Sequence, residues 1–192
     1  MVKKNDIKSI KLTIEALLRE TERKGIEQLL EYMDKNGFYT APCSTKYHLN
    51  VPGGLAKHSF NVWAYAQGLS ETLLDSEECC DITDNITIVS FLHDLGKMGQ
   101  FGKEQYVPNG DKKAPYLYNS ELLPVDHEIR SIAIASRFIE LTEEEQFAIL
   151  YHNGLYTPVG AKNLQGHETK LQMILHFADM WASRVVDEDE SV

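Results

Sequence analysis

Apolar residues recur at intervals of three and four positions along most of the chain, which is the spacing of amphipathic helices. Asp84 and Thr142 are typical N-cap residues, Thr142 with Glu145 is typical of a capping box, and Asn36-Gly37 is typical of a helix end. The pattern therefore predicts an all-α fold. The expected helices cover residues 5–20, 24–36, 55–75, 84–97 and 125–140, a stretch from 143 to about 152, and residues 168–186.

Segments without the helical spacing separate these helices. Residues 38–53 contain Pro42 and run into Pro52-Gly53-Gly54, which predicts a long loop that is either functional or a surface connector. Residues 105–118 hold short β-type runs on either side of a turn-rich stretch that contains Asn109-Gly110 and Lys112-Lys113, which predicts a small hairpin or flap, expected over a site. Residues 155–167 contain glycine and proline and are expected to form a loop.

Length and composition indicate one domain. The chain has 192 residues, of which 43% are hydrophobic and 25% charged, and this is ordinary for a globular protein with a single core. Residues 1–37 are expected to pack as N-terminal helices on a domain of residues 38–186, with an acidic, solvated tail at 187–192. The three cysteines form no CxxC and suit a reducing cytosol. No apolar run approaches the roughly 18 residues of a membrane span, so we expect a cytoplasmic protein without a membrane partner.

The balance of charge narrows the classes of partner. The formal net charge is −10, which argues against broad, non-specific wrapping of nucleic acid, because such binding needs many contacts from lysine and arginine to phosphate. A small phosphorylated substrate remains compatible with this charge, since bound metal ions can supply positive charge locally.

Polar residues interrupt helices that otherwise resemble core. His93 and Asp94 lie in an apolar run at Ile88–Lys97, and an unpaired buried carboxylate costs several kcal/mol. A metal ion is the partner that best fits an adjacent His-Asp pair. Lys97 follows Asp94 by three positions, so it is expected either to pair with the carboxylate or to reach a substrate phosphate.

Other helices offer further candidate ligands. Each has an ordinary explanation when taken alone, as a hydrogen-bonded core residue, but together they would need partners. Imidazole and carboxylate ligands suit Mn, Fe, Co, Ni or Zn, and the set is too large for one open tetrahedral site but fits two ions bridged by Asp94. The candidate ligands are His58, His93, Asp94, His127, His152 and Asp179.

These motifs resemble the HD-domain superfamily of metal-dependent phosphohydrolases over about residues 38–185. The matching stretches are Gly53-Gly54-Leu55-Ala56-Lys57-His58, His93-Asp94-Leu95-Gly96-Lys97 and His176-Phe177-Ala178-Asp179. The segment 40–58 is similar to small stand-alone HD hydrolases of bacteria and their phages, and to the HD half of 3′–5′ exoribonucleases. Where the exoribonuclease-like members tend to have His-His-Gly, this chain has His152-Asn153-Gly154.

The resemblance implies an HD-type helical bundle and assigns metal-binding roles to the candidate ligands. It makes His58, His93, Asp94 and Asp179 the ligands of a first metal, and it matches His127 and His152 to the extra histidines of the two-metal branch.

The expected activity is hydrolysis of a phosphate ester of a nucleotide or of an RNA or DNA end. Two ions favour a phosphodiester, and one favours a nucleoside monophosphate or triphosphate. Asp94 is expected to bridge the metals and hold the attacking hydroxide, and Lys97 to contact a phosphate oxygen. Lys46, Lys57 and Arg130 are candidates for holding the rest of the substrate. The alternatives are a di-iron oxygenase with the same ligands, a module that binds a nucleotide or metal without turnover, and a plain helical interaction domain.

Overall fold

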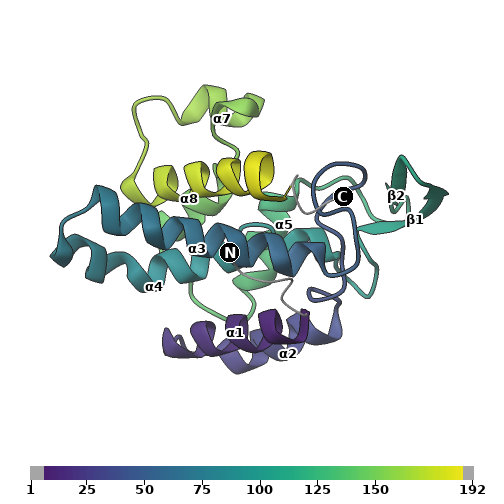
Figure 1. Cartoon of the computed structure of the whole chain (residues 1–192), viewed down its shortest axis with the longest axis horizontal. Helices are drawn as coiled ribbons and strands as arrows, with labels where there is room; N and C mark the ends of the chain where they lie inside the picture. The colour runs from purple at the N-terminus through teal and green to yellow at the C-terminus, as the bar shows by residue number, and fades with distance from the viewer. Residues whose placement is uncertain (1–6, 188–192) are drawn as a thin grey trace.

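The computed structural model describes residues 7–187 and shows a mostly helical protein with a small two-stranded sheet (Figure 1). A π-helical turn, η3 (Ala182–Val186), continues the last helix, and the 3₁₀ turns η1 (Leu95–Met98) and η2 (Gly154–Tyr156) lie between helices. The α-helices are α1 (Ile7–Glu20), α2 (Ile26–Lys35), α3 (Gly54–Leu73), α4 (Ser76–Leu92), α5 (His127–Ala135), α6 (Glu143–Leu150), α7 (Pro158–Asn163) and α8 (Lys170–Trp181).

Helices α3 and α4 lie side by side in the middle of the molecule, with α8 on one side of them and α1 and α2 on the other (Figure 1). The second half of α4 is buried all round, from Ile86 to Leu92, because it packs against α3, α6 and α8. Its first half is polar and largely exposed, so it carries no apolar period. For that reason the start predicted at Asp84 is wrong: α4 begins at Ser76, where Asp75 accepts hydrogen bonds from the backbone N–H groups of Glu77 and Glu78.

The N-terminal helices pack on this centre through one apolar face. Ile10, Ile14 and Leu18 of α1 are buried, and α1 contacts both α3 and α4. The link between α1 and α2 is tied to α6, because the Arg23 guanidinium donates to the buried carboxylate of Glu145 at 2.6 Å. Glu145 also completes the predicted capping box with Thr142 at the start of α6, which is confirmed.

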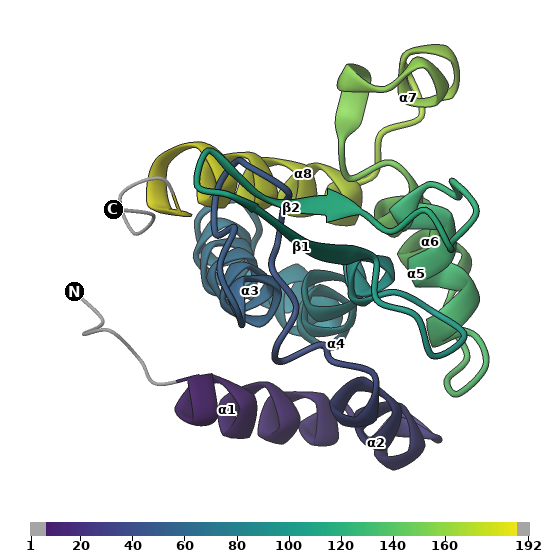
Figure 2. The same cartoon turned by 90° about the vertical axis from the view of Figure 1, so that its right-hand side faces the viewer.

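The hairpin predicted within residues 105–118 is confirmed. Strands β1 (Tyr106–Asp111) and β2 (Ala114–Tyr118) pair antiparallel, with Tyr106 opposite Tyr118. The backbone N–H of Tyr116 donates to the carbonyl of Thr45 at 3.3 Å, so the hairpin is attached to the loop at 38–53. Figure 2 shows these segments crossing one another in front of α3 and α4.

The C-terminal third departs from the prediction at both ends. The expected loop at 155–167 contains α7, which is opened by the Thr157 cap with Pro158 in its first turn and is too short to show a period. The acidic tail was expected to start at residue 187, but Asp187 is fully buried because its carboxylate is bound inside the bundle. The rest of the predicted tail, 188–192, lies outside the described residues.

Candidate metal centre

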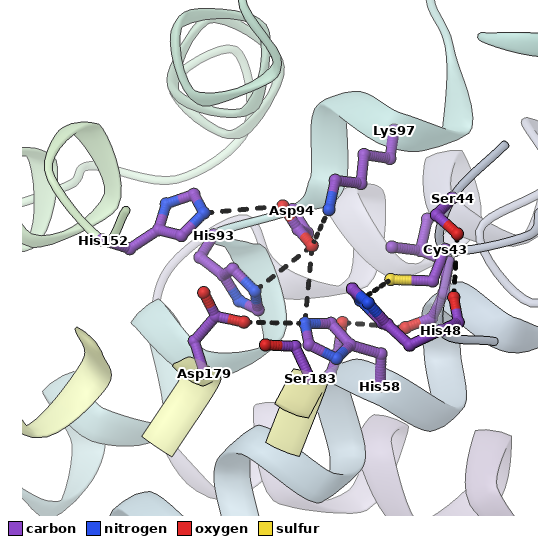
Figure 3. Close-up of polar contacts among 12 residues, drawn as sticks. Cys43, Ser44, His48, His58, His93, Asp94, Lys97, His152, Asp179 and Ser183 are labelled. Carbon is purple, nitrogen blue, oxygen red and sulfur yellow. Dashed lines mark hydrogen bonds and ion pairs between the residues drawn. The ribbon is translucent and has the colours of Figure 1, made fainter. Parts of the chain in front are cut away.

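The structure brings all the candidate ligands to one place, at the ends or on the inner faces of different helices. His58 lies on α3, His93 directly follows α4, His127 is the first residue of α5, and Asp179 lies on α8. His152 lies just beyond the end of α6. Figure 3 shows Asp94 between these elements, with His58, His93, His152 and Lys97 pointing toward it.

The two carboxylate oxygens of Asp94 face different pairs of imidazoles. Its Oδ2 lies 3.5 Å from Nε2 of His58 and 3.4 Å from Nε2 of His93. Its Oδ1 lies 3.2 Å from Nε2 of His127 and 3.7 Å from Nε2 of His152. On the first side, Asp179 adds an oxygen 3.1 Å from Nε2 of His58. Asp94 is therefore placed to share one oxygen with each of two ligand groups.

Several donor atoms of this cluster lack the partners that buried polar atoms normally have, whereas Nε2 of His152 accepts from Nδ2 of Asn153 at 3.1 Å. Within residues 7–187, no hydrogen-bond partner is found for Nε2 of His58, His93 and His127 or for Oδ1 of Asp94, although all are buried. The ligand atoms within each of three groups lie within 4.8 Å of one another. The cluster therefore fits one or two divalent cations, since imidazole and carboxylate are the donors such ions take. The groups are His58, His93 and Asp94; His93, His152 and Asp179; and Asp94, His127 and His152.

The outer nitrogen of each imidazole is held by the surrounding protein. An Nδ1–H that donates to a carbonyl or carboxylate leaves the lone pair on Nε2, which is the tautomer a metal ligand needs. The Nδ1 contacts are His58 to Asp187 at 2.7 Å, His93 to the Ser90 carbonyl at 2.8 Å, His152 to the Ile149 carbonyl at 2.8 Å, and His127 to Glu128 at 3.3 Å. Sequence analysis missed Asp187 and Glu128, since a terminal acidic run and a first-turn glutamate both look like solvated residues.

The charges of the cluster favour ionised carboxylates. Burial would raise the pKa of Asp94, but the Lys97 ammonium at 2.6 Å and the nearby His93 imidazole hold it well below its usual value. Burial likewise opposes ionisation of Asp179, and the approach of His58 lowers the pKa of this carboxyl. Burial lowers the pKa of His152 to about 4, so this imidazole is neutral and able to ligate at neutral pH.

His58 shows that the first side of the cluster attracts positive charge. Burial would lower the pKa of His58, but the carboxylates of Asp179 and Asp187 raise it well above its usual value. A proton on this imidazole or a metal cation beside it would neutralise the same excess of negative charge.

A cavity of about 650 Å³ opens onto the cluster, and only one of the three predicted substrate-binding residues lines it. Lys46 and Lys97 line it, together with His152 and Asp179, but Lys57 is not among its lining residues. Arg130 is buried, and it donates to Gln100 at 3.1 Å and to the Leu123 carbonyl at 3.0 Å. Its guanidinium therefore makes contacts within the protein and does not line this cavity. The cavity also has lining residues that sequence analysis did not select: Tyr47, His48, Asn153, Ser183 and Arg184.

The loop at 38–53 reaches the cluster. Cys43 lies 3.5 Å from Nε2 of His48, and the His48 ring lies 5.2 Å from the His58 ring (Figure 3). Of the two interpretations left open by the sequence, these contacts favour a functional loop over a plain connector. The sequence holds one indication that His48 is functional, because it is an imidazole in a segment without helical period.

His176 supports the cluster from outside. Its Nδ1 contacts the His152 carbonyl at 2.7 Å, and its ring fills the space beside Gly154, where a Cβ would lie 2.6 Å from the ring. Gly154 has a φ of +60°, so a side chain there would be strained as well as blocked. His176 therefore fixes the turn that carries His152, although it lies one helical turn from Asp179.

Comparisons with family models, with curated proteins and with solved structures gave no match to this chain. Within the described residues, no helix is both long enough and apolar enough to cross a membrane.

Proposed function

We propose that this protein is a metal-dependent phosphohydrolase of the HD type, acting on a phosphodiester of a nucleotide or of a nucleic-acid end. The observation that carries the proposal is the position of Asp94, with one oxygen facing His58 and His93 and the other facing His127 and His152. A carboxylate shared in this way is the arrangement expected for a bridging ligand, and the Nε2 atoms of His58, His93 and His127 have no hydrogen-bond partner in residues 7–187.

The residues divide into two ligand groups. In this proposal His58, His93, Asp94 and Asp179 hold one ion, and Asp94, His127 and His152 hold a second. Bound divalent ions lower the pKa of water toward neutrality and neutralise charge on phosphoryl oxygens. The Asp94 carboxylate would supply negative charge to both ions.

Lys97 supplies positive charge from the protein itself. Its Nζ lies 2.6 Å from Oδ2 of Asp94, and its side chain also lines the cavity. From this position it can donate to an oxygen of a phosphate that enters the cavity.

The charge of the cavity supports a phosphate ester over the substrate of a di-iron oxygenase. Lys46, Lys97 and Arg184 all line it, in a chain whose formal net charge is −10. A local excess of cations in an acidic protein attracts an anion, and a phosphate ester needs such an environment. Oxidation of a neutral substrate would not need it.

The test is Mn²⁺-supported hydrolysis of bis(p-nitrophenyl) phosphate, a diester, and of p-nitrophenyl phosphate, a monoester. We expect diester cleavage by the wild type, at least about 100-fold less by Asp94→Ala, and none after removal of metal by a chelator. Asp84→Ala is the matched control, because Asp84 is an exposed aspartate on α4. Circular dichroism checks that Asp94→Ala folds, and Asp179→Asn is a second, milder variant of the same ligand group.

The outcomes separate the alternatives. Cleavage of the monoester alone would indicate a nucleotidase and contradict the diester part of the proposal. Absence of cleavage of both compounds by the metal-loaded wild type would overturn the proposal. Tightly bound iron with oxygen uptake would then identify the oxygenase.

A further inference from the structure

The candidate metal centre lies between two cavities of opposite character. The first, called here the basic cavity, is the one of about 650 Å³ that contains Lys46, Lys97 and Arg184. The second, called here the apolar cavity, has about 610 Å³ and contains Tyr118, Leu123, Pro124 and Val125. Both volumes lie in the range of about 300–1,000 Å³ that is typical of small-molecule sites.

Each cavity includes candidate ligands of the cluster around Asp94. Asp179 and His152 line the basic cavity, and His127 lines the apolar cavity. Because His127 Nε2 lies 3.2 Å from Asp94 and Asp179 Oδ1 lies 3.1 Å from His58, both cavities reach the same cluster. A substrate whose reacting group lies at Asp94 can therefore extend into both.

The basic cavity has more cationic groups than its own carboxylates can balance. Its one lining carboxylate, Asp179, is already committed to the cluster. Lys97 is paired with Asp94, but neither Lys46 nor Arg184 forms an ion pair with any carboxylate of residues 7–187. Lys46 lies near the Tyr47 ring, 5.2 Å from its centroid, and both Lys46 and Arg184 are exposed. These groups are available to an anion other than the one at the cluster.

The apolar cavity has the opposite balance. Its lining includes no lysine or arginine, and it contains the carboxylate of Asp126. Tyr118 and Leu123 are both well exposed, with 67% and 80% of their surface accessible. An aromatic and aliphatic surface next to a carboxylate disfavours a second phosphate and favours the flat face of a base.

We propose that the substrate carries two phosphate groups, with the scissile one at Asp94 and the second in the basic cavity, held by Lys46 and Arg184. The nucleoside on the other side of the scissile phosphate occupies the apolar cavity. The inference rests on the proposed function and narrows its substrate to a 5′-phosphorylated dinucleotide or the 5′-phosphorylated end of a longer strand. Water adds across the scissile P–O bond, giving an alcohol on one nucleoside and a phosphate monoester on the other.

The test compares a dinucleoside monophosphate with the same dinucleotide carrying a 5′-phosphate. We expect the wild type to prefer the phosphorylated compound by about 10-fold or more in kcat/KM, because charge-assisted hydrogen bonds to phosphate are strong. Lys46→Ala and Arg184→Ala should each lose most of this preference, and the double variant all of it. Lys24→Ala is the matched control, because Lys24 is an exposed lysine between α1 and α2, away from all the described cavities, and it should keep the preference.

The same pair of compounds separates failure of this inference from failure of the proposed function. Equal kcat/KM for both compounds, or a preference that survives in the double variant, would overturn the inference and leave the phosphodiesterase in place. If the wild type cleaves neither compound, the proposed function fails. The inference is then tested by the dissociation constants of analogues with a methylene in place of the bridging oxygen, and equal values would overturn it.

A further binding experiment shows whether the second phosphate belongs to a dinucleotide or to the end of a longer strand. A longer single strand with the same 5′-phosphorylated end should bind as tightly as the dinucleotide if only the end is recognised. Tighter binding of the dinucleotide would identify a small-molecule substrate. Binding of the strand that does not depend on its 5′-phosphate would contradict the inference.

Discussion

Each imidazole of the cluster is fixed on its outer nitrogen, so that its inner nitrogen is left for a ligand. His93 and His152 use backbone carbonyls that lie three residues earlier in the chain, so their own helix ends orient them. His58 instead depends on a carboxylate from a distant segment, since its Nδ1 contacts Asp187 at 2.7 Å. Asp187 also accepts from Asn61 at 2.8 Å, which fixes the carboxylate in turn.

Replacing the Asp187 carboxylate should weaken metal binding without removing a ligand. We expect Asp187→Asn to lower the affinity for Mn²⁺ or Zn²⁺ by about 10- to 100-fold, because the amide makes His58 a weaker and less well oriented ligand. Competition with a fluorescent chelator measures the dissociation constant. Asp81→Asn, an exposed aspartate on α4, is the control and should bind metal as the wild type does. An unchanged affinity in Asp187→Asn would contradict the role of Asp187.

Cys43 should be unreactive in the folded protein despite its neighbouring imidazole. Burial raises the pKa of the Cys43 thiol to about 11 and lowers the pKa of His48 to about 4. At neutral pH His48 is therefore uncharged and cannot stabilise a thiolate at Cys43. We expect a thiol reagent near pH 8 to modify the exposed Cys80 first, and the rate at Cys43 to rise only as the pH approaches 11.

Mass spectrometry of the labelled peptides measures both rates. Unfolded protein is the control, because the same reagent should then modify Cys43 and Cys80 alike. Labelling of Cys43 as fast as Cys80 in the folded state would contradict this assignment.

At the scale of elements, the helix ends carry most of the chemistry. The turn η1 directly follows His93 and Asp94, and it packs against the start of α5, where His127 lies. Gly96 permits this contact: a Cβ at position 96 would lie 2.4 Å from the His127 carbonyl oxygen. The backbone N–H of Gly96 also donates to Ser131 of α5 at 2.8 Å. The spacing of the two ligand groups therefore depends on close backbone packing at one glycine.

Gly96→Ala should separate η1 from α5. We expect a loss of about 1–3 kcal/mol in the free energy of unfolding, from overpacking, and a weaker or absent second metal ion, because His127 moves relative to Asp94. Urea denaturation measures the first effect, and metal stoichiometry by mass spectrometry of the native protein measures the second.

Gly68→Ala is the matched control for this glycine. It lies within α3, and a Cβ there would meet nothing within 4 Å. It should stabilise the protein by about 0.5–1 kcal/mol, since alanine is the better helix former. A Gly96→Ala protein with wild-type stability and two bound ions would contradict the packing argument.

The elements that sequence could predict are those whose apolar faces repeat. The amphipathic face of α3 was readable because burial imposes the period, and the second half of α4 was readable as a continuous apolar run. The hairpin was readable from the turn-rich stretch between its β-type runs, but its turn lies at Lys112-Lys113, and Asn109-Gly110 lies within β1. The first half of α4, with its exposed Asp81 and Asp84, has no buried face to reveal it. The π-helical turn at Ala182–Val186 was not predictable either, because its wider winding depends on contacts with α3 and α8.

The residues of the candidate site were also predictable only in part. Histidines and aspartates within apolar runs, such as His93, Asp94 and Asp179, were identifiable because burial of such groups needs a partner. Arg184 and the half-buried Asn153 were not, since polar residues near helix ends occur everywhere on a surface. Arg130 was predicted to hold the substrate, but its contacts with Gln100 and Leu123 depend on tertiary structure that no local pattern contains.

At the scale of the whole molecule, the ion pair between Arg23 and Glu145 joins the N-terminal helices to the rest. Arg23 lies between α1 and α2, and its guanidinium holds both oxygens of Glu145, which is fully buried at the start of α6. Arg19 offers a contrast, because its pair with Glu27 is exposed, with 45% and 66% of the two side chains accessible. The first pair connects distant segments, and the second connects α1 with its neighbour α2.

Removing Arg23 should therefore destabilise the fold more than removing Arg19. We expect Arg23→Ala to lower the free energy of unfolding by about 3 kcal/mol, because the Glu145 carboxylate is left buried without its cation. Arg19→Ala should barely change stability, since exposed pairs contribute little. Urea denaturation at neutral pH compares them, and similar losses in the two variants would contradict the argument.

The contact between His58 and Asp187 also has a consequence for biosynthesis. The two residues are 129 positions apart, and a ribosome makes His58 long before its partner. A nascent chain that has reached η1 already carries His58, His93 and Asp94, but it cannot yet present His58 with its outer nitrogen bound to Asp187. Metal captured at that stage would be held loosely and exchange readily, and the tight site would form only when the segment around Asp187 leaves the exit tunnel. Tight binding of the ion would thus come after synthesis of both segments, and not at the stage when His58, His93 and Asp94 are first present.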